Sequence, residues 1–156
     1  MQWWGMDTHG RPPRLRSWDY SRSGPYFVTL VVHSRIPCLR VGGQTGAPLS
    51  PEGDAVRIAW ERLATHFDRV RLDEFTVMPD HVHGILWLYD HPRHRTDLGQ
   101  VVRAWKASAT RAIRATWPDF RWQTGFYDRI IRDHRALTAV RRYVRSNRLH
   151  HGGNAT

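Results

Sequence analysis

The sequence predicts an α+β domain in which helices pack on one antiparallel sheet. Residues 26–33 and 81–89 are two runs of β-branched and aromatic residues with the composition of buried strands. A further strand is expected over 70–79, and the turn at Pro79-Asp80 is so short that it must join antiparallel strands. Apolar residues recur at helical spacing in three longer segments. Together these observations favour a sandwich of ferredoxin-like type.

The elements are expected in the order strand, helix, strand, strand, helix, short strand and helix. Residues 1–24 are rich in Arg, Pro, Gly and Ser and should form an irregular basic arm. The glycines and prolines of 41–51 predict a loop after the first strand. Ser50 followed by Pro51 favours a helix start, and this helix should run to about Phe67. Its expected buried stripe consists of Val56, Trp60, Leu63 and Phe67.

Two helices and a short extended segment complete the chain. Thr96 or Asp97 can cap the second helix, and Pro118 ends it because proline disfavours a helical residue before it. Residues 120–132 mix aromatic and basic side chains and are expected to be extended. The last helix should run from about 133 to 149. Its expected buried residues are Leu137, Val140 and Val144.

The composition fits one globular domain. With 156 residues, of which 40% are hydrophobic, the chain is long enough to bury a core. No apolar run approaches the length of a membrane span, and the N-terminus lacks the features of a signal peptide. The single Cys38 excludes an internal disulfide and fits the reducing cytoplasm. The expected organisation is a basic arm of residues 1–24, a single domain of residues 25–152 and a disordered tail of residues 153–156.

The basic residues are concentrated in the second half of the chain. The net charge is +10, and residues 91–156 hold 14 basic and 4 acidic side chains, whereas residues 1–90 hold 10 of each. All basic residues except Lys106 are arginines, which suit bidentate contacts to phosphates and bases. Tryptophans lie among these arginines, and this combination indicates nucleic acid as a partner. The alternative is a basic surface that serves solubility alone, or an arginine bias from GC-rich coding.

His81 and His83 are separated by one residue at the start of an expected strand. Alternate side chains of a strand share a face, so the two imidazoles can bind one metal ion together. Two histidines on a half-exposed strand can equally be polar surface residues. The apolar remainder of the strand places the pair where the sheet meets solvent, which favours the metal.

Tyr143 and Asn147 lie four residues apart in the last expected helix and therefore on one face. A deprotonated tyrosine is a nucleophile, but its ordinary pKa of about 10 requires help from a cation or base. The amide oxygen of Asn147 is an acceptable ligand for a hard divalent ion. With His81 and His83 it would form a three-ligand set with open positions for phosphate oxygens. Alternatively, Tyr143 is a half-buried aromatic residue and Asn147 a helix C-terminal one.

Two other groups compete for these roles. Tyr127 is an alternative nucleophile, but it falls in an extended segment and has no amide side chain four residues later. A cluster of histidines suggests a second metal site, but its members have no regular spacing and are interpreted as solvated loop and tail. They are His91, His94, His150 and His151.

Beyond the spacing of these residues, four segments resemble those of single-tyrosine transposases with the HUH motif. Met78 to Ile85 is similar to the HUH motif itself, in which U is a bulky apolar residue, here Val82. The segment Tyr20 to Thr29 looks like the first strand of the REP-associated branch. The similarity extends from about Arg14 to Gly152. The remaining matching segments are Trp122-Gln123 with Phe126 to Asp133, and the catalytic tyrosine segment Tyr143 to Asn147.

The resemblance implies an HUH endonuclease fold and a transposase that cleaves and rejoins single-stranded or hairpin DNA at hairpin-bearing repeats. His81, His83 and Asn147 would be ligands of Mg²⁺ or Mn²⁺, and Tyr143 would form a 5′-phosphotyrosine intermediate. It further implies a bacterial, nucleoid-associated, cytoplasmic protein without membrane contact, expected as a monomer with a homodimer as the alternative. One departure is Arg148, where this branch usually has proline, so the helix can continue and Arg148 can reach DNA.

The basic residues of the second half are expected to bind the DNA. Trp122 can stack on an unpaired base or pack in the core, and Gln123 can contact a base edge. Trp105 and Trp117 are expected to be core residues. The arginines and lysine expected to contact DNA are Arg103, Lys106, Arg111, Arg114, Arg132, Arg145 and Arg148.

Other functions fit parts of the pattern. The main alternative is a domesticated, catalytically weak protein that binds hairpin DNA, although binding alone requires neither Tyr143 nor Asn147. A replication-initiator-like relaxase would share the histidine motif but usually carries further domains. A metal-dependent RNA nuclease is a more remote alternative.

Overall fold

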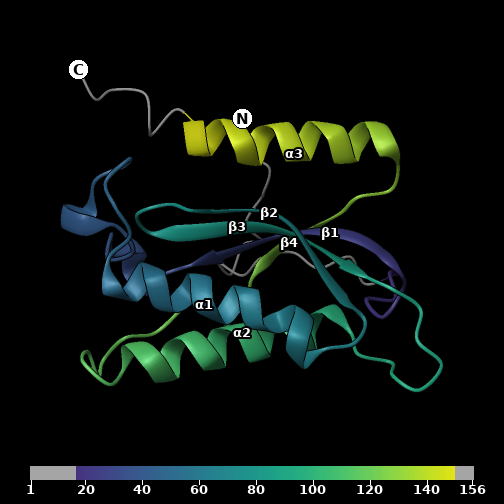
Figure 1. Ribbon diagram of the computed structural model, residues 1–156, viewed down its shortest axis with the longest axis horizontal. Helices are drawn as coiled ribbons and strands as arrows, with labels where there is room; N and C mark the ends of the chain where they lie inside the picture. Colours follow the sequence, from purple (N-terminus) through teal and green to yellow (C-terminus); the bar gives the residue numbers. More distant parts are fainter. Residues whose placement is uncertain (1–16, 150–156) are drawn as a thin grey trace.

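The protein is a four-stranded antiparallel sheet with two helices on one face and one helix on the other (Figure 1). This computed structural model describes residues 17–149. The strands follow the order β2-β3-β1-β4. The elements are β1 (Gly24–Val31), α1 (Pro51–His66), β2 (Val70–Val77), β3 (His81–Leu88), α2 (Leu98–Ile113), β4 (Tyr127–Ile130) and α3 (His134–Leu149). Two short 3₁₀ turns, His33–Arg35 and Val41–Gly43, precede α1.

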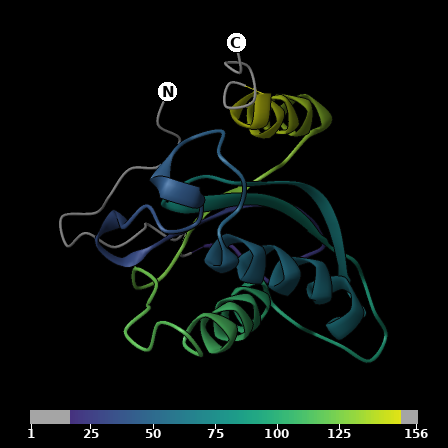
Figure 2. The ribbon, with the colours of Figure 1, turned by 60° about the vertical axis from the view of Figure 1, so that its left-hand side comes forward.

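The topology confirms the expected α+β class. The β1-α1-β2 unit leaves a gap that β3 fills, pairing antiparallel with both strands. The α2 helix then leads to β4, which pairs with the free edge of β1. This is the split β-α-β arrangement that the order of elements predicts. The α3 helix is added to it and lies on the opposite side of the sheet from α1 and α2 (Figures 1 and 2).

The helix ends follow the expected signals. Ser50 caps α1 by accepting a hydrogen bond from the backbone N–H of Gly53 at 3.0 Å. Asp97 and Gln100 form a reciprocal capping box at the start of α2. The α2 helix ends at Ile113, and residues 114–116 form a turn before Pro118, which was expected to end the helix.

The expected extended segment of 120–132 is mostly irregular. Only Tyr127–Ile130 forms a strand, and Trp122 makes an isolated bridge with Val32. The part of the basic arm that the structure describes turns back on the sheet, where Trp18 donates a hydrogen bond to the hydroxyl of Tyr26 at 3.1 Å. The tail of 153–156 lies outside the described residues. Within them, no helix is long and apolar enough to cross a membrane.

The main core lies between the sheet and the helices α1 and α2. Trp60 stacks on Phe75 with ring centroids 4.8 Å apart and contacts Trp105 at 4.9 Å. Gly84 allows this approach, because a Cβ atom at that position would lie 2.5 Å from the Trp60 ring. Trp105 is fully buried, in agreement with its expected core position, and Trp117 packs against the same core.

A smaller apolar cluster holds α3 on the other face of the sheet. Leu137, Val140 and Val144 of α3 pack on Phe27 of β1 and Ile85 of β3. This confirms the buried stripe expected for the last helix. The two strands therefore present one set of side chains to the main core and the alternate set to α3. The histidines of β3 belong to the α3 side, as the contacts of His83 with Phe27 and Tyr143 show.

Candidate metal and nucleophile site

His81 and His83 lie on the same face of β3, with their Nε2 atoms 3.1 Å apart. His83 is fully buried and His81 is partly exposed. Two nitrogens at this spacing, each about 2.1 Å from a common ion, would subtend about 95° there. That is close to the angle between neighbouring ligands of an octahedral ion. The pair therefore fits a shared divalent metal.

The other ring nitrogen of each histidine has a partner of its own. Asp80 Oδ1 lies 2.6 Å from Nδ1 of His81, and Thr29 Oγ1 lies 2.9 Å from Nδ1 of His83. A carboxylate that accepts from Nδ1–H leaves the Nε2 lone pair free to bind metal. Such partners also fix the ring orientation, so the two Nε2 atoms converge.

The electrostatics favour neutral imidazole at His83 and a charged carboxylate at Asp80. Burial, with a smaller contribution from the neighbouring His81, lowers the pKa of His83 to about 3. The hydrogen bond from His81 holds the pKa of Asp80 below its usual value, with a smaller contribution from Arg35 at 3.6 Å. Asp80 therefore remains an acceptor for His81 at neutral pH.

Tyr143 of α3 lies against the histidine pair. Its ring centroid is 5.6 Å from that of His83 and 6.1 Å from that of Phe27, both in edge-on geometry. Phe27 in turn stacks on His83 at 5.3 Å. The rings of His83 and Phe27 fix the place of the tyrosine, which is half-buried and so retains access to solvent. The structure thus brings together three of the four residues singled out from the sequence.

Asn147 follows Tyr143 by one helical turn and is also half-buried. It lies on the same side of α3 as the tyrosine. The helix continues through Arg148 to Leu149, as expected from an arginine in place of proline. The side chain of Arg148 lies outside the described residues. The role of Asn147 as third ligand stays a prediction.

Tyr127 also lies on the α3 side of the sheet, but deeper. It pairs with Thr29, which pairs on its other side with His83, so two strand spacings separate Tyr127 from the histidine. Its side chain is buried, and its hydroxyl lies 3.4 Å from Nε2 of Gln123. Burial makes Tyr127 a poorer candidate than Tyr143 for attack on a large substrate.

The basic residues of α2 and of its C-cap, Arg114, differ in their contacts. Arg103, Arg111 and Arg114 are exposed, and Arg114 also donates a hydrogen bond to the carbonyl of Phe120 at 2.9 Å. Lys106 instead donates to the carbonyl of Gln123 at 3.0 Å and to that of Gly125. Burial lowers the pKa of Lys106 to about 8. Lys106 therefore connects α2 to the loop before β4.

The remaining expected DNA contacts are distributed over several elements. Trp122 is 9% exposed and packs edge-on against Phe120, which agrees with the core alternative for this residue. Gln123 is half-buried. Arg132 is exposed and lies 5.5 Å from the ring centroid of Trp18, and Arg145 is exposed but paired with Glu74 at 2.7 Å.

Thr29 and Asp80 are site residues that the sequence pattern did not identify. Asp80 immediately precedes His81, and an acidic residue beside a histidine motif is a signal that could have been used. Thr29 lies in the middle of an apolar strand 54 residues before its partner. Only the register of β1 against β3 places it opposite His83.

A second group of possible metal ligands lies where β3 ends and β2 begins. It consists of Asp68, His91 and His94, whose ligand atoms lie within 4.8 Å of one another. His94 already pairs with Asp68 at 3.3 Å, and Nδ1 of His91 accepts a hydrogen bond from the backbone of Arg93. That bond leaves the proton of a neutral ring on Nε2. His91 is therefore less well prepared for a metal than His81 or His83.

Comparisons with known proteins bear on this geometry. A family model described as IS200-like transposase matches residues 56–147, a range that includes both histidines, Tyr143 and Asn147. An uncharacterized protein of Haemophilus influenzae is 29% identical over 160 residues, which cover 89% of this chain and 88% of that protein.

Two solved structures are similar in fold. One is a REP-associated tyrosine transposase bound to a REP hairpin, with a TM-score of 0.66 and 23% identity over 90% of this chain and 74% of that chain. The other is a crystal structure from Deinococcus radiodurans R1, provisionally described as a transposase, with a TM-score of 0.53 and 18% identity. It covers 86% of this chain and 97% of that chain. At these identities the likeness establishes the fold.

Proposed function

Because the chain belongs to the IS200-like transposase family, we propose that it cleaves and rejoins single-stranded DNA at hairpin-bearing repeats, with Tyr143 as nucleophile. The observation that carries the proposal is the contact of Tyr143 with His83, whose Nε2 lies 3.1 Å from that of His81. A nucleophile beside two convergent metal ligands is an arrangement suited to phosphoryl transfer.

His81, His83 and Asn147 would hold a Mg²⁺ or Mn²⁺ ion. When bound, such an ion polarises the scissile phosphate and neutralises its developing charge. Imidazole ligands suit Mn²⁺ as well as Mg²⁺. The contacts of Asp80, which accepts from His81, and of Thr29 with His83 support this role, because they direct both Nε2 atoms toward one point.

The proposed reaction transfers the 5′ phosphate of one DNA strand from a 3′ oxygen to Tyr143 and then to another 3′ oxygen. The hydroxyl oxygen of Tyr143 attacks phosphorus, the bond from phosphorus to the 3′ oxygen breaks, and a 5′-phosphotyrosine forms. Tyr143 loses a proton and the leaving 3′ oxygen gains one, so no net proton is consumed. A second 3′-hydroxyl then reverses these steps and joins a new strand.

The exposed arginines would bind the substrate. Arg103 and Arg111 of α2, with Arg114 at its C-cap, form a basic face suited to phosphates of a folded hairpin, and Lys106 lies within it. The similar structure that holds a REP hairpin supports a hairpin as the ligand class. Further contacts are proposed for Trp122, Gln123, Arg132, Arg145 and Arg148.

The histidines and the nucleophile come from one chain, which supports a monomer as the active unit, with a homodimer as the alternative. A protein that acts on chromosomal repeats would work in the bacterial cytoplasm at the nucleoid. The basic surface and the reduced Cys38 fit that location.

The test is a trapping experiment with a labelled hairpin oligonucleotide that carries a single-stranded flank. In Mn²⁺ the wild-type protein should form a covalent adduct that resists denaturation, and Tyr143→Phe should form none. Tyr127→Phe is the matched control and should retain the adduct. Adduct formation by Tyr143→Phe would refute the assignment of the nucleophile.

The same experiment separates the domesticated binder from the enzyme. Hairpin binding that persists in chelator, together with no cleavage in Mg²⁺ or Mn²⁺, would favour a protein that only binds. Cleavage that depends on both metal and Tyr143 would exclude it.

A further inference from the structure

Two consecutive acidic residues of β2 both face α3. The register of β2 against β3 shifts by one residue between Leu72 and Phe75, which marks a β-bulge. In a regular strand Asp73 and Glu74 would point to opposite faces. Here the bulge turns both toward α3, while Phe75 returns to the main core and stacks on Trp60.

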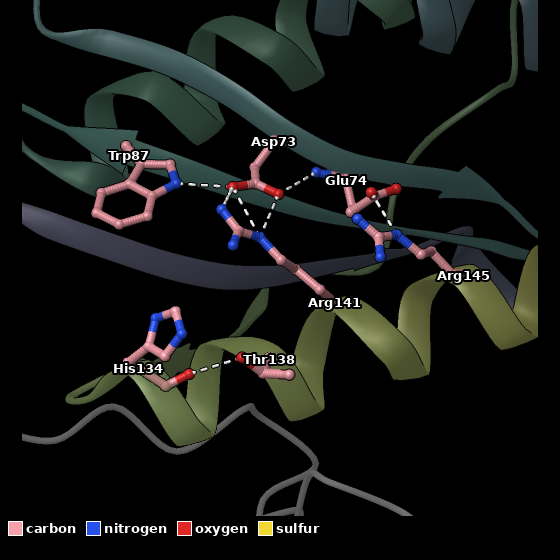
Figure 3. A network of polar contacts seen from close by, with 7 residues as sticks. All are labelled: Asp73, Glu74, Trp87, His134, Thr138, Arg141 and Arg145. Carbon is pink, nitrogen blue, oxygen red and sulfur yellow. Dashed lines mark hydrogen bonds and ion pairs between the residues drawn. The ribbon is translucent and has the colours of Figure 1, made fainter.

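Asp73 receives hydrogen bonds from three different elements of the local structure (Figure 3). Arg141 of α3 donates to both carboxylate oxygens, through Nε at 3.0 Å and Nη2 at 2.6 Å. Trp87 of β3 donates from Nε1 at 2.9 Å, and the backbone N–H of Glu74 donates at 2.8 Å. Only 12% of the Asp73 side chain is exposed. A bidentate, largely buried pair of this kind fixes orientation as well as distance.

Arg145, one helical turn after Arg141, pairs with Glu74 at 2.7 Å (Figure 3). The two arginines therefore connect one edge of α3 to two successive residues of β2. Tyr143 lies on the other edge of the buried face, because two residues along a helix correspond to a rotation of about 200°. The apolar stripe of α3 runs between these two edges.

The apolar stripe alone would hold α3 loosely in register. Leu137, Val140 and Val144 are of similar size and recur along the helix, and apolar contacts have no directional preference. A rotation or a shift of α3 along its axis would move the Tyr143 hydroxyl relative to His83. The charge pairs have a directional preference, and their spacing of one turn defines both the rotation and the axial position.

We propose that Asp73 and Glu74 are positioning residues, which hold α3 in the register that places Tyr143 against the histidine pair. This inference rests on the proposed function of Tyr143 as nucleophile. It assigns the β2 bulge a role in the reaction although neither acidic residue contacts the histidines.

The test compares Asp73→Asn and Glu74→Gln with Asp54→Asn, a control that removes an exposed ion pair of α1, Asp54 with Arg57 at 2.6 Å. We expect Asp73→Asn to lower the rate of adduct formation at saturating hairpin at least about ten-fold, since a misplacement of 1 Å can cost up to about a hundred-fold. Hairpin affinity should change less than about two-fold, because no phosphate contact is removed. Glu74→Gln, whose partner is more exposed, keeps the test valid if Asp73→Asn folds poorly.

Charge exchange gives a rescue arm. The double variant Asp73→Arg with Arg141→Asp restores an ion pair of reversed sense, and it should react faster than either single variant. Equal rates for Asp73→Asn, Glu74→Gln and Asp54→Asn would overturn the proposal.

Hydrogen exchange gives a readout that does not need catalysis. Backbone amides of α3 should exchange faster in Asp73→Asn than in the wild type or in Asp54→Asn. If the wild type forms no adduct, the proposed function fails, and hydrogen exchange alone then tests whether Asp73 and Glu74 hold α3 in register. Unchanged exchange of the α3 amides in Asp73→Asn would refute the positioning role.

Discussion

Thr29 Oγ1 lies 2.9 Å from Nδ1 of His83, across the central strand pair of the sheet. Both residues are almost completely buried, so the hydroxyl is a fixed neighbour of the imidazole. Thr29 lies deep in the strand and does not contact solvent, yet it sets the orientation of the histidine that touches Tyr143. The orientation of the histidine pair therefore depends on a residue from a strand that carries none of the expected ligands.

Replacement of Thr29 by valine should weaken metal binding. Valine keeps the shape but removes the hydroxyl, which leaves the ring of His83 without its orienting partner. Loss of such a partner typically lowers metal affinity about 10- to 100-fold. The rate of adduct formation, measured at a series of Mn²⁺ concentrations, gives the change in metal affinity. Thr76→Val is the matched control, because Thr76 is also buried and pairs with His83 from β2, on the side opposite Thr29. An equal loss of metal affinity in Thr76→Val would contradict the prediction.

Removal of either histidine should separate chemistry from binding. His81→Ala and His83→Ala should abolish cleavage, because each removes one of the two convergent nitrogens. Hairpin affinity should remain within a few-fold, since it comes from arginines elsewhere on the surface. Gel-shift assays in chelator and cleavage assays in Mn²⁺ measure the two properties side by side. Cleavage by His83→Ala at the wild-type rate would show that the pair is not the metal site.

The basic face of α2 should determine the salt dependence of binding. Arg103→Gln with Arg111→Gln removes two exposed charges, and it should lower the slope of log affinity against log salt by about 2 units for duplex contacts. Hairpin affinity measured between low and moderate salt gives this slope. The matched control is Arg62→Gln with Arg71→Gln, two exposed residues away from α2. The same change in the control would show that the effect is not specific to α2.

Lys106 should make stability depend on pH in the alkaline range. Its pKa is lowered from 10.5 to about 8 by burial, so between these values the unfolded chain binds more protons than the folded one. The free energy of unfolding that Lys106 contributes should therefore rise with pH from about 8 to about 10.5. Comparison with Lys106→Met cancels the other groups. Urea unfolding of both proteins at pH 7.5 and 9.5 gives the two free energies of unfolding. The wild-type value minus the Lys106→Met value should be more positive at pH 9.5 than at pH 7.5. A difference independent of pH would contradict the buried cation.

Local patterns predicted the elements with small errors at their ends. The sequence predicts Ser50 as a cap and offers Thr96 or Asp97 for the second helix, of which Asp97 is the cap, because capping depends on residues within one turn. The strand of 81–89 and the last helix were found for the same reason, since their side-chain periodicities are local. The sequence predicts an extended segment over 120–132, but only Tyr127–Ile130 is a strand, because loop contacts such as that of Lys106 with Gln123 hold the residues before it.

The candidate site was predicted in part. His81, His83 and Tyr143 were identified by spacing and by resemblance, and the structure brings them together. Trp122 could not be assigned from the sequence, because an aromatic residue has the same local signature in a core and on a stacking surface. Lys106 was expected to contact DNA on the basis of its charge alone. Its two carbonyl partners come from a loop whose position the sequence does not reveal.

The sequence by itself determined the class of fold, the pairing of the histidines on one strand face and the pairing of Tyr143 with Asn147 on one helix face. These properties depend on backbone periodicities of two residues and of 3.6 residues, which act over short distances along the chain. The tertiary structure decided which strand residue orients His83, which face of the sheet α3 covers and how the bulge of β2 anchors it. Those relationships join residues 54 to 71 positions apart, and they follow from strand register and helix docking. Such contacts arise only when the whole domain packs.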